Sequence, residues 1–378
     1  MGFSTDAIHA GQTPDLTTGA VITPIYQTST YAQEELGVNK GYEYGRTHNF
    51  TRQALEKNIA TLEKGNFGIA FSSGLAAIQS VLFLLKPGSH VIVTENIYGG
   101  TFRLMDSIFK DYGIEFTWVD TSDIRKVKKA VKLNTKMVYI ETPTNPLLRL
   151  TDLRGVAYIC KKHKLISVVD NTFMTPYFQQ PLKFGIDVVL HSTTKYLNGH
   201  SDVIGGIVIT NNSEIHERLR YLQNAVGAVP SPFDCWLTLR ATKTLSVRMK
   251  QHNENAIKIA KYLSKNPKVK KVFYPGLPNH PHYKLAKRQM SGFGGMLTAD
   301  FGSINLVKKI LKSVKIFTLA ESLGGVESLI SHPASMTHAS VPKNLREKMG
   351  ITDGLIRFSV GIEDVEDLIA DITQAIGK

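Results

Sequence analysis

Short apolar, β-branched runs alternate with longer amphipathic stretches between residues 54 and 243. Runs of this length, bounded by turn formers, predict strands, and the stretches between them predict helices. Such alternation is typical of an α/β fold, with a mostly parallel sheet covered by helices on both faces. The predicted strands are 67–71, 90–94, 115–119, 137–141, 166–170, 188–191 and 207–210, and the predicted helices lie near 75–85, 101–112, 122–133, 152–163 and 213–225.

The pattern changes near residue 243 and differs again before residue 50. A long amphipathic stretch over 248–265 leads into predicted strands at 269–274, 296–301 and 356–360 and helices at 304–313 and 363–376. We therefore expect a large domain over 51–243 and a smaller α+β domain over 244–378. Residues 1–50 carry many turn formers and little periodicity, which predicts an extended arm that packs on another subunit.

Composition narrows the class of protein. The 378 residues are 42% hydrophobic and 20% charged, as in soluble globular proteins. The two cysteines, Cys160 and Cys235, lie outside any C-x-x-C pattern, which excludes a disulfide scaffold and a cysteine-based zinc site. No apolar run reaches the ~18 residues of a membrane span, and no signal-peptide core is present, so we expect a cytoplasmic protein without membrane contact.

The net charge of +13 does not by itself indicate nucleic-acid binding. The excess of 45 Lys and Arg over 32 Asp and Glu is spread over short lysine clusters with apolar spacing. Zinc-finger and RNA-binding patterns are absent, so these clusters are interpreted as solvated faces. His48, His280 and His282 are interpreted as loop residues, and no metal site is expected.

Three polar sites follow predicted strands of the large domain. Ser73-Gly74-Leu75 opens a helix after the first strand, where it forms either a phosphate-binding loop or a plain capped turn. Asp170 ends an apolar strand, where a carboxylate needs a cationic partner unless it caps a helix. Lys195, in Ser192-Thr193-Thr194-Lys195, is either a surface lysine or an amine activated by burial.

Other motifs explain these residues less well. The S-x-x-K spacing also occurs in penicillin-binding proteins, but the accompanying S-D-N and K-T-G strings are missing. No G-x-G-x-x-G follows a strand and no Walker A sequence occurs. A phosphate loop, a strand-end aspartate and then a lysine together favour pyridoxal 5′-phosphate (PLP) as the cofactor.

Eight strings occur together along the chain: YEYGR (42–46), SGLAA (73–77), YGGT (98–101), ETPTNP (141–146), VDNT (169–172), STTKYLNGHS (192–201), AESLGGVESL (320–329) and MTHAS (336–340). In these strings the chain resembles the cystathionine γ-synthase/γ-lyase family of PLP-dependent trans-sulfuration enzymes, and γ-lyases most of all. The resemblance covers residues 5 to 376 and implies the aspartate-aminotransferase-like fold (fold type I).

The resemblance implies a role for each matching residue. Lys195 would hold PLP covalently and move protons, and Asp170 would keep the pyridine nitrogen protonated. Tyr98 would stack on the ring and act in acid–base steps. Tyr44 and Arg46 would reach the cofactor phosphate of a neighbouring subunit, in a homotetramer built as a dimer of dimers. The other implied cofactor ligands are Gly74, Leu75, Asn145, Thr172, Ser192 and Thr194, and the implied substrate ligands are Arg103, Glu321, Ser322, Leu323 and Arg357.

The implied reaction is γ-elimination of L-cystathionine to cysteine, 2-oxobutanoate and ammonia. Cystathionine γ-synthase activity, in which cysteine replaces the acyl group of an O-acylhomoserine, is the alternative. Gly100 stands where methionine γ-lyases typically have cysteine, which argues against that activity. A binding protein without catalysis would be expected to lack Lys195 or Asp170, and both are present.

One string departs from the family pattern. Members usually have Asn-Pro-Thr-Arg after the Tyr-x-Arg of the arm, whereas this chain has Asn49-Phe50-Thr51-Arg52. We expect the loss of proline to loosen this loop, because proline fixes its own φ angle.

Overall fold

A seven-stranded sheet forms the centre of the N-terminal two thirds of the chain. The computed structural model describes residues 1–339 and 341–377, so Ser340 of the MTHAS string lies outside the described residues. The strand order is β1-β7-β6-β5-β4-β2-β3, and β7 runs in the direction opposite to the other six strands of this sheet. The strands are β1 (Phe67–Phe71), β2 (His90–Thr94), β3 (Glu115–Val119), β4 (Thr135–Glu141), β5 (Ile166–Asp170), β6 (Val188–Ser192) and β7 (Gly206–Thr210).

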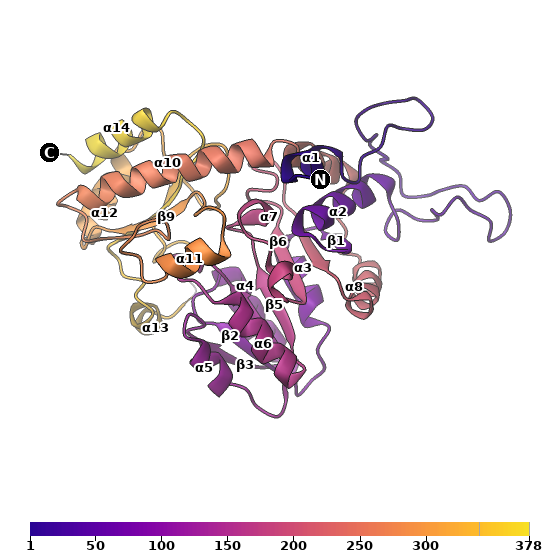
Figure 1. Ribbon diagram of the computed structural model, residues 1–378, viewed down its shortest axis with the longest axis horizontal. Helices are drawn as coiled ribbons and strands as arrows, with labels where there is room; N and C mark the ends of the chain where they lie inside the picture. Colours follow the sequence, from indigo (N-terminus) through magenta and orange to yellow (C-terminus); the bar gives the residue numbers. More distant parts are fainter. Residues whose placement is uncertain (340, 378) are drawn as a thin grey trace.

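These strands confirm the mostly parallel sheet, and helices cover both of its faces (Figure 1). The predicted helix over 101–112 is shorter: α4 changes to a π-helix at Met105 and ends at Phe109. The predicted helix over 122–133 also shortens. The helices of this region are α2 (Phe50–Glu63), α3 (Gly74–Leu82), α4 (Gly99–Leu104), α5 (Ile124–Lys129), α6 (Leu153–His163), α7 (Thr175–Phe178), α8 (Ser213–Val226) and α9 (Pro232–Thr242).

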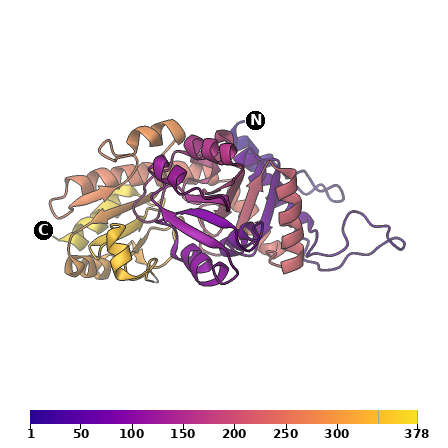
Figure 2. The ribbon, with the colours of Figure 1, turned by 90° about the horizontal axis from the view of Figure 1, so that it is seen from below.

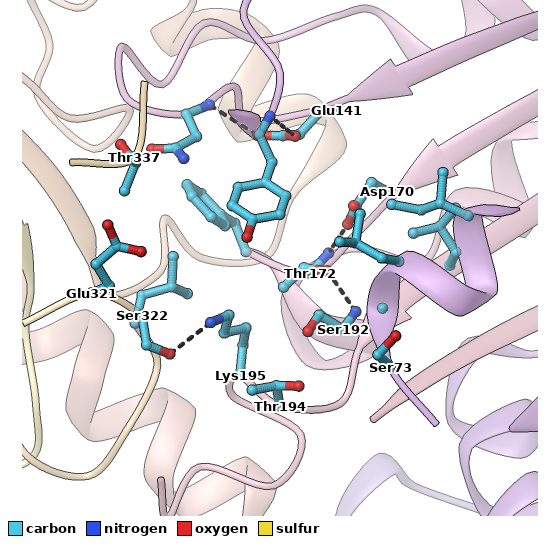
Figure 3. A pocket seen from close by; sticks show the side chains of 18 of the residues that line it. Ser73, Glu141, Asp170, Thr172, Ser192, Thr194, Lys195, Glu321, Ser322 and Thr337 are labelled. Carbon is cyan, nitrogen blue, oxygen red and sulfur yellow. Dashed lines mark hydrogen bonds between the residues drawn. The ribbon is translucent and has the colours of Figure 1, made fainter. Parts of the chain in front are cut away.

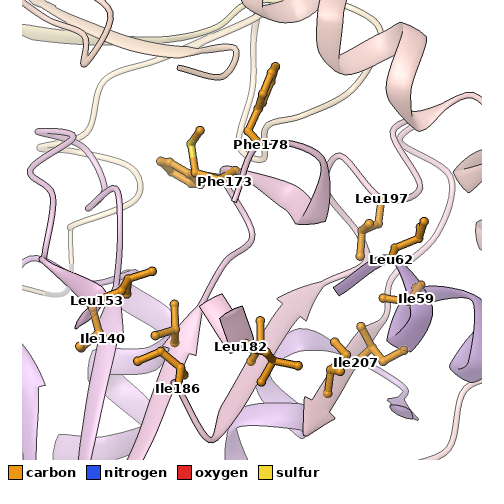
Figure 4. Close-up of a cluster of buried hydrophobic side chains, with 14 of the residues drawn as sticks. Ile59, Leu62, Ile140, Leu153, Phe173, Phe178, Leu182, Ile186, Leu197 and Ile207 are labelled. Carbon is orange, nitrogen blue, oxygen red and sulfur yellow. The ribbon is translucent and has the colours of Figure 1, made fainter. Parts of the chain in front are cut away.

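Successive side chains of each strand enter different cores, and this alternation decides where the polar strand ends point. Val169 packs with Ile59 and Leu62 of α2 and with α6, in the cluster shown in Figure 4. Val168 and Leu190 pack instead with α3, α4 and α8. Because side chains alternate along a strand, Asp170 shares the face of Val168, on the α3 side of the sheet.

The N-terminus differs from the predicted arm. Residues Phe3–His9 form a helix, α1, that packs on α2. Asn58 Nδ2 donates to the carbonyl oxygen of Ala7 (3.2 Å), and Lys64 Nζ lies 2.9 Å from Asp6 Oδ2. Residues 16–47 do extend away from the body, as Figure 1 shows, with Leu16 and Leu36 fully exposed.

The first turn of α2 holds this extended segment despite the missing proline. Phe50 packs against the rings of Tyr26 and Tyr42, with centroids 5.2 and 6.4 Å away. The buried Arg52 guanidinium donates to the carbonyl oxygens of Gly45 (2.9 Å), Arg46 (3.0 Å) and Thr47 (2.8 Å). The expected loosening of the loop is therefore offset by aromatic packing and by three hydrogen bonds from Arg52.

A second, five-stranded sheet has the order β10-β11-β12-β9-β8. Residues of α10, α12 and α14 pack on it and form a separate core. This sheet lies at one end of the molecule and residues 16–47 at the other (Figure 2). The elements are α10 (Leu245–Lys265), β8 (Lys271–Phe273), α11 (Tyr283–Gln289), β9 (Met296–Asp300), α12 (Ile304–Ser313), β10 (Thr318–Leu319), β11 (Leu329–Ser331), α13 (Lys343–Lys348), β12 (Leu355–Ser359) and α14 (Val365–Ile376).

Within the described residues, no helix is long and apolar enough to span a membrane. Both cysteines are buried and unpaired.

Candidate active site

A cavity of about 460 Å³ opens where the carboxyl ends of β4, β5 and β6 meet the C-terminal sheet. This is the position at which parallel α/β sheets bind ligands. Figure 3 shows the polar side chains that point into it. Most of the predicted site residues line the cavity: Gly74, Leu75, Tyr98, Asn145, Asp170, Thr172, Ser192, Thr194, Lys195, Glu321, Ser322, Leu323 and Arg357.

The start of α3 forms an anion-binding corner. Ser73 caps the helix by accepting from the N–H of Ala76 (3.0 Å). The N–H groups of Gly74 and Leu75 have no acceptor within the helix, and the helix dipole adds partial positive charge there. A Cβ on Gly74 would lie 3.1 Å from Ser192 Cβ, so glycine lets β6 approach closely. The corner therefore fits a phosphate group.

Asp170 lies beside this corner, at the end of β5. Its Oδ1 accepts from the N–H of Thr172 (3.0 Å), and the hydroxyl of Thr172 accepts from the N–H of Ser192 (2.9 Å). Burial raises the pKa of Asp170, and the Thr172 hydrogen bonds oppose that shift. A bound cation would stabilise the ionised carboxylate, as a protonated ring nitrogen would.

A buried network supports the same strands from the opposite face of the sheet. Glu63, the last residue of α2, lies 2.6 Å from His191 Nε2 and accepts from Asn171 Nδ2 (2.8 Å). Asn171 follows Asp170, and His191 precedes Ser192. The end of α2 thus fixes β5 and β6 relative to each other. The sequence analysis did not identify Glu63, because nothing local marks it as a partner of these strands.

Lys195 reaches the cavity from the loop after β6. Its Nζ donates to the hydroxyl of Ser322 (2.6 Å). Burial lowers the pKa of Lys195 to about 8; Arg357 lowers it further, whereas Glu321 opposes the shift. Roughly a tenth of the amine is then neutral at pH 7, far more than for an exposed lysine. A neutral amine can attack a carbonyl group or accept a proton.

Arg357 is a buried cation on β12 that lines the cavity. Its Nη1 donates to Asn145 Oδ1 (3.2 Å) and its Nη2 to the carbonyl oxygen of Ser322 (2.8 Å). Burial lowers its pKa to about 10, so it stays charged at neutral pH. It has no carboxylate within ion-pair distance among the described residues. A guanidinium in this situation suits a ligand carboxylate.

The ring of Tyr98 is positioned by the glycine two residues later. A Cβ on Gly100 would lie 2.4 Å from Tyr98 Cε1, so any side chain there would displace the ring. Tyr98 is 45% exposed and lines the cavity, which leaves its ring free to contact a bound ligand.

Three predicted site residues lie outside the cavity of their own chain. Arg46 donates from Nε to Asn224 Oδ1 (3.1 Å), and its guanidinium lies 5.4 Å from the centroid of the Tyr44 ring. Arg103 is exposed on α4. Ser73 of the predicted loop also lines the cavity, as do residues to which the sequence analysis gave no role, among them Glu141 and Thr337. Glu141 ends a predicted strand in the same way as Asp170, and that signal could have revealed it.

Comparisons with known proteins agree with this geometry. Residues 4–377 match the family described as PLP-dependent enzymes of Cys/Met metabolism. The chain is 56% identical to a protein named cystathionine gamma-lyase from Bacillus subtilis, covering 100% of this chain and 99% of the relative. It is 54% identical to a protein named cystathionine beta-lyase from Coxiella burnetii, covering 99% and 97%. Further relatives are named cystathionine gamma-synthase.

A solved structure confirms the fold. The crystal structure of metB from Corynebacterium glutamicum superposes with a TM-score of 0.97 at 50% identity, covering 100% of this chain and 98% of the other.

Proposed function

Because the chain belongs to the PLP-dependent enzymes of cysteine and methionine metabolism, we propose that it catalyses the γ-elimination of L-cystathionine. In this reaction the bond between Cγ and sulfur breaks, and cystathionine and water yield cysteine, 2-oxobutanoate and ammonia. PLP is its cofactor, and its enzyme class is the PLP-dependent carbon–sulfur lyases. Within that class, what we propose is the reaction itself: γ-elimination rather than β-elimination or γ-replacement.

The residues present fit the cofactor. The first turn of α3, with Gly74 close to Ser192, suits the phosphate, and Asp170 suits the ring nitrogen. Asn145 would hydrogen-bond the ring hydroxyl through its amide nitrogen, since its oxygen already accepts from Arg357. Bound PLP would supply the electron sink that stabilises negative charge developing next to the substrate α-carbon.

The observation that carries the proposal is that Lys195 and Arg357 meet at Ser322 in a cavity that Glu321 also lines. The hydroxyl of Ser322 accepts from Lys195 Nζ (2.6 Å), and its carbonyl oxygen accepts from Arg357 Nη2 (2.8 Å). Arg357 would bind the α-carboxylate of the substrate, and the exposed Glu321 would pair with the ammonium group at its far end. Cystathionine carries both ends. Lys195 would take the α-proton and then a β-proton, and Tyr98 would assist in acid–base steps.

Product analysis tests the proposal. Purified, PLP-loaded protein is incubated with L-cystathionine alone, and cysteine, homocysteine, 2-oxobutanoate and pyruvate are quantified. Cysteine with 2-oxobutanoate in equal amounts is the expected result. Homocysteine with pyruvate would overturn it in favour of β-elimination, which the names of relatives at 54% identity make the second candidate. Absence of product, followed by cystathionine formation from an O-acylhomoserine and cysteine, would establish γ-replacement instead.

The rate of covalent PLP capture by the apoprotein is expected to rise with pH around a midpoint near 8. The pKa of Lys195 is lowered to about 8 by burial, so its neutral, reactive form accumulates as the pH increases through that value. Stopped-flow absorbance of the visible band measures this rate. For an exposed lysine, the midpoint of this rate would lie at pH ~10.4. A midpoint above 10 would contradict the buried position of Lys195.

We further propose that the enzyme is a cytoplasmic homotetramer whose active sites are shared between neighbouring subunits. Residues 16–47 expose apolar side chains that would be covered by a second chain, and Tyr44 and Arg46 lie outside the cavity of their own chain. Arg46→Ala is expected to raise the dissociation constant of PLP about tenfold through loss of a charged contact to phosphate.

Mixing two variants, at a PLP concentration too low to load Arg46→Ala, decides whether the site is shared. Hybrids of Arg46→Ala and Lys195→Ala chains contain one site with both native residues if Arg46 acts in the neighbouring subunit. About a quarter of the native activity should then return after mixing in equal amounts. If Arg46 serves its own chain, mixing restores nothing.

A further inference from the structure

Glu141 is a buried carboxylate in the cavity to which neither the family resemblance nor the proposed mechanism gives a role. It ends β4 and is 6% exposed. Each of its oxygens accepts one backbone hydrogen bond: Oε1 from the N–H of Asn145 (3.1 Å) and Oε2 from the N–H of Tyr98 (2.9 Å). Figure 3 shows both contacts at the edge of the cavity.

These two N–H groups belong to different loops. Tyr98 lies in the loop between β2 and α4, and Asn145 lies in the loop between β4 and α6. The two strands are neighbours in the sheet, and beyond their ends the half-exposed Arg149–Glu95 pair joins the outer parts of the loops (3.1 Å), whereas the contacts at the cavity are those of Glu141. The carboxylate of Glu141 therefore links two segments that each carry a site residue.

The Asn145 branch of this link continues across the cavity. Asn145 Oδ1 accepts from Arg357, and Arg357 also donates to the carbonyl oxygen of Ser322. The hydroxyl of Ser322 accepts from Lys195 Nζ. A single run of hydrogen bonds thus extends from Glu141 to the amine of Lys195. A shift of Asn145 would change the direction of the Arg357 guanidinium.

The position of Glu141 is electrostatically unfavourable. It is the direct neighbour of Asp170 in the β4–β5 register, so two carboxylates lie side by side. Burial and Asp170 raise the pKa of Glu141 to about 8, whereas the N–H groups of Tyr98 and Asn145 and the charge of Arg357 oppose the shift. An apolar residue would avoid this cost but would leave the N–H groups of Tyr98 and Asn145 without their acceptors.

We propose that Glu141 is a positioning residue that holds the Tyr98 loop and the Asn145 loop together through its two carboxylate oxygens. It thereby aligns the Tyr98 ring on one side of the cofactor site and the Asn145–Arg357 pair on the other. The role applies to γ-elimination, β-elimination and γ-replacement alike, so it does not depend on which of these the enzyme performs.

Glu141→Gln distinguishes the proposed acceptor role of Glu141 from a role in which its side chain only fills space. Glutamine has the same shape but one acceptor oxygen, and its NH₂ group would face the second backbone N–H. One of the two loops is therefore released. Asp187→Asn is the matched control: Asp187 precedes β6 at the opposite edge of the sheet, and its Oδ2 accepts from the N–H (2.8 Å) and the hydroxyl (2.6 Å) of Ser167, away from both loops and from the cavity lining.

Amide hydrogen exchange gives a readout that does not depend on activity. In the apoprotein and the holoenzyme, peptides containing Tyr98 or Asn145 should exchange at least tenfold faster in Glu141→Gln than in the native protein. Asp187→Asn should leave both peptides unchanged. The variant should also release PLP more readily, with a dissociation constant raised about tenfold, and its visible absorption band should shift.

Kinetics complete the test. Turnover of L-cystathionine, assayed for all four possible products, should fall 10- to 100-fold in kcat/KM for Glu141→Gln and less than twofold for Asp187→Asn. Native exchange at both loops, together with native PLP affinity and spectrum, would overturn the proposal even if activity fell. Failure of cystathionine as a substrate for the native enzyme would instead refute the proposed function and leave the exchange and PLP results valid.

A second variant guards against misfolding of the first. Glu141→Asp keeps the charge but is one methylene shorter, so it cannot reach both N–H groups, and it should show the same loss. If both variants fail to fold, the native protein still decides. The amides of Tyr98 and Asn145 should then be among the slowly exchanging groups, and exchange as fast as in the exposed segment 16–47 would overturn the proposal.

Discussion

Replacement of Lys195 with alanine is expected to abolish turnover of L-cystathionine, with a loss of at least ~10³-fold in kcat. Lys195 supplies the only lysine amine that lines the cavity among the described residues, and the proposed reaction needs that amine for both covalent attachment and proton transfer. The visible absorption of the bound cofactor should vanish as well. Absorbance spectra and a product assay measure the two effects.

The same variant should remain folded, which separates chemistry from stability. The pKa of Lys195 is lowered in the folded state, so its contribution to stability is complete above the unfolded pKa of ~10.4 and is lost as the pH falls to about 8. At pH 7 the native apoprotein therefore holds a buried ammonium at a cost. Lys195→Ala removes that cost, and its apoprotein should unfold at a temperature no lower than the native one. Turnover within tenfold of native would contradict the role of Lys195.

Replacement of Asp170 with asparagine is expected to lower kcat about 10²- to 10³-fold while covalent PLP attachment through Lys195 persists. Asparagine keeps the acceptor oxygen for the N–H of Thr172 but carries no charge. It therefore cannot stabilise a protonated ring nitrogen, and the electron sink weakens in the charged transition state. Steady-state kinetics at saturating PLP, together with the absorption spectrum, measure the effect.

A carboxylate at the opposite edge of the sheet provides the control. Asp187 precedes β6 and accepts from the hydroxyl (2.6 Å) and the N–H (2.8 Å) of Ser167, outside the cavity lining. Asp187→Asn should reduce thermal stability and leave the holoenzyme spectrum and kcat nearly unchanged. Equal kinetic losses in the two variants would show that Asp170 acts through stability alone.

The strands of the central sheet could be predicted from the sequence because each is a local, buried apolar run. β1, β2, β3 and β5 have the predicted bounds. Helix ends were less predictable, since they depend on hydrogen bonds that compete near the termini. The predicted helix over 101–112 changes to a π-helix at Met105, a change that no local signal announced.

Much of the site could also be predicted, for a geometric reason. Residues that follow parallel strands meet at one edge of the sheet, so Asp170 and Lys195 were expected to lie together before any tertiary contact was known. Glu141 carries the same strand-end signal and was missed. The single sequence gives no reason to expect that its two oxygens reach loops as far apart in the chain as Tyr98 and Asn145.

The sequence by itself determined the α/β class, the cofactor and the order of the residues along the sheet edge that binds it. Both signals, the alternation of apolar and polar positions and the polar residues that follow strands, depend only on residues that are close together in the chain. Only the tertiary structure decided the role of α2. Its buried residues include Arg52, Glu56, Asn58 and Glu63. Because these residues are polar, the spacing of apolar residues does not identify α2 as a helix of the core. Arg52 holds the carbonyl oxygens of residues 45–47, and Glu63 holds the ends of β5 and β6. Polar groups can be buried only where distant partners satisfy their hydrogen bonds, and those partners exist only in the folded chain.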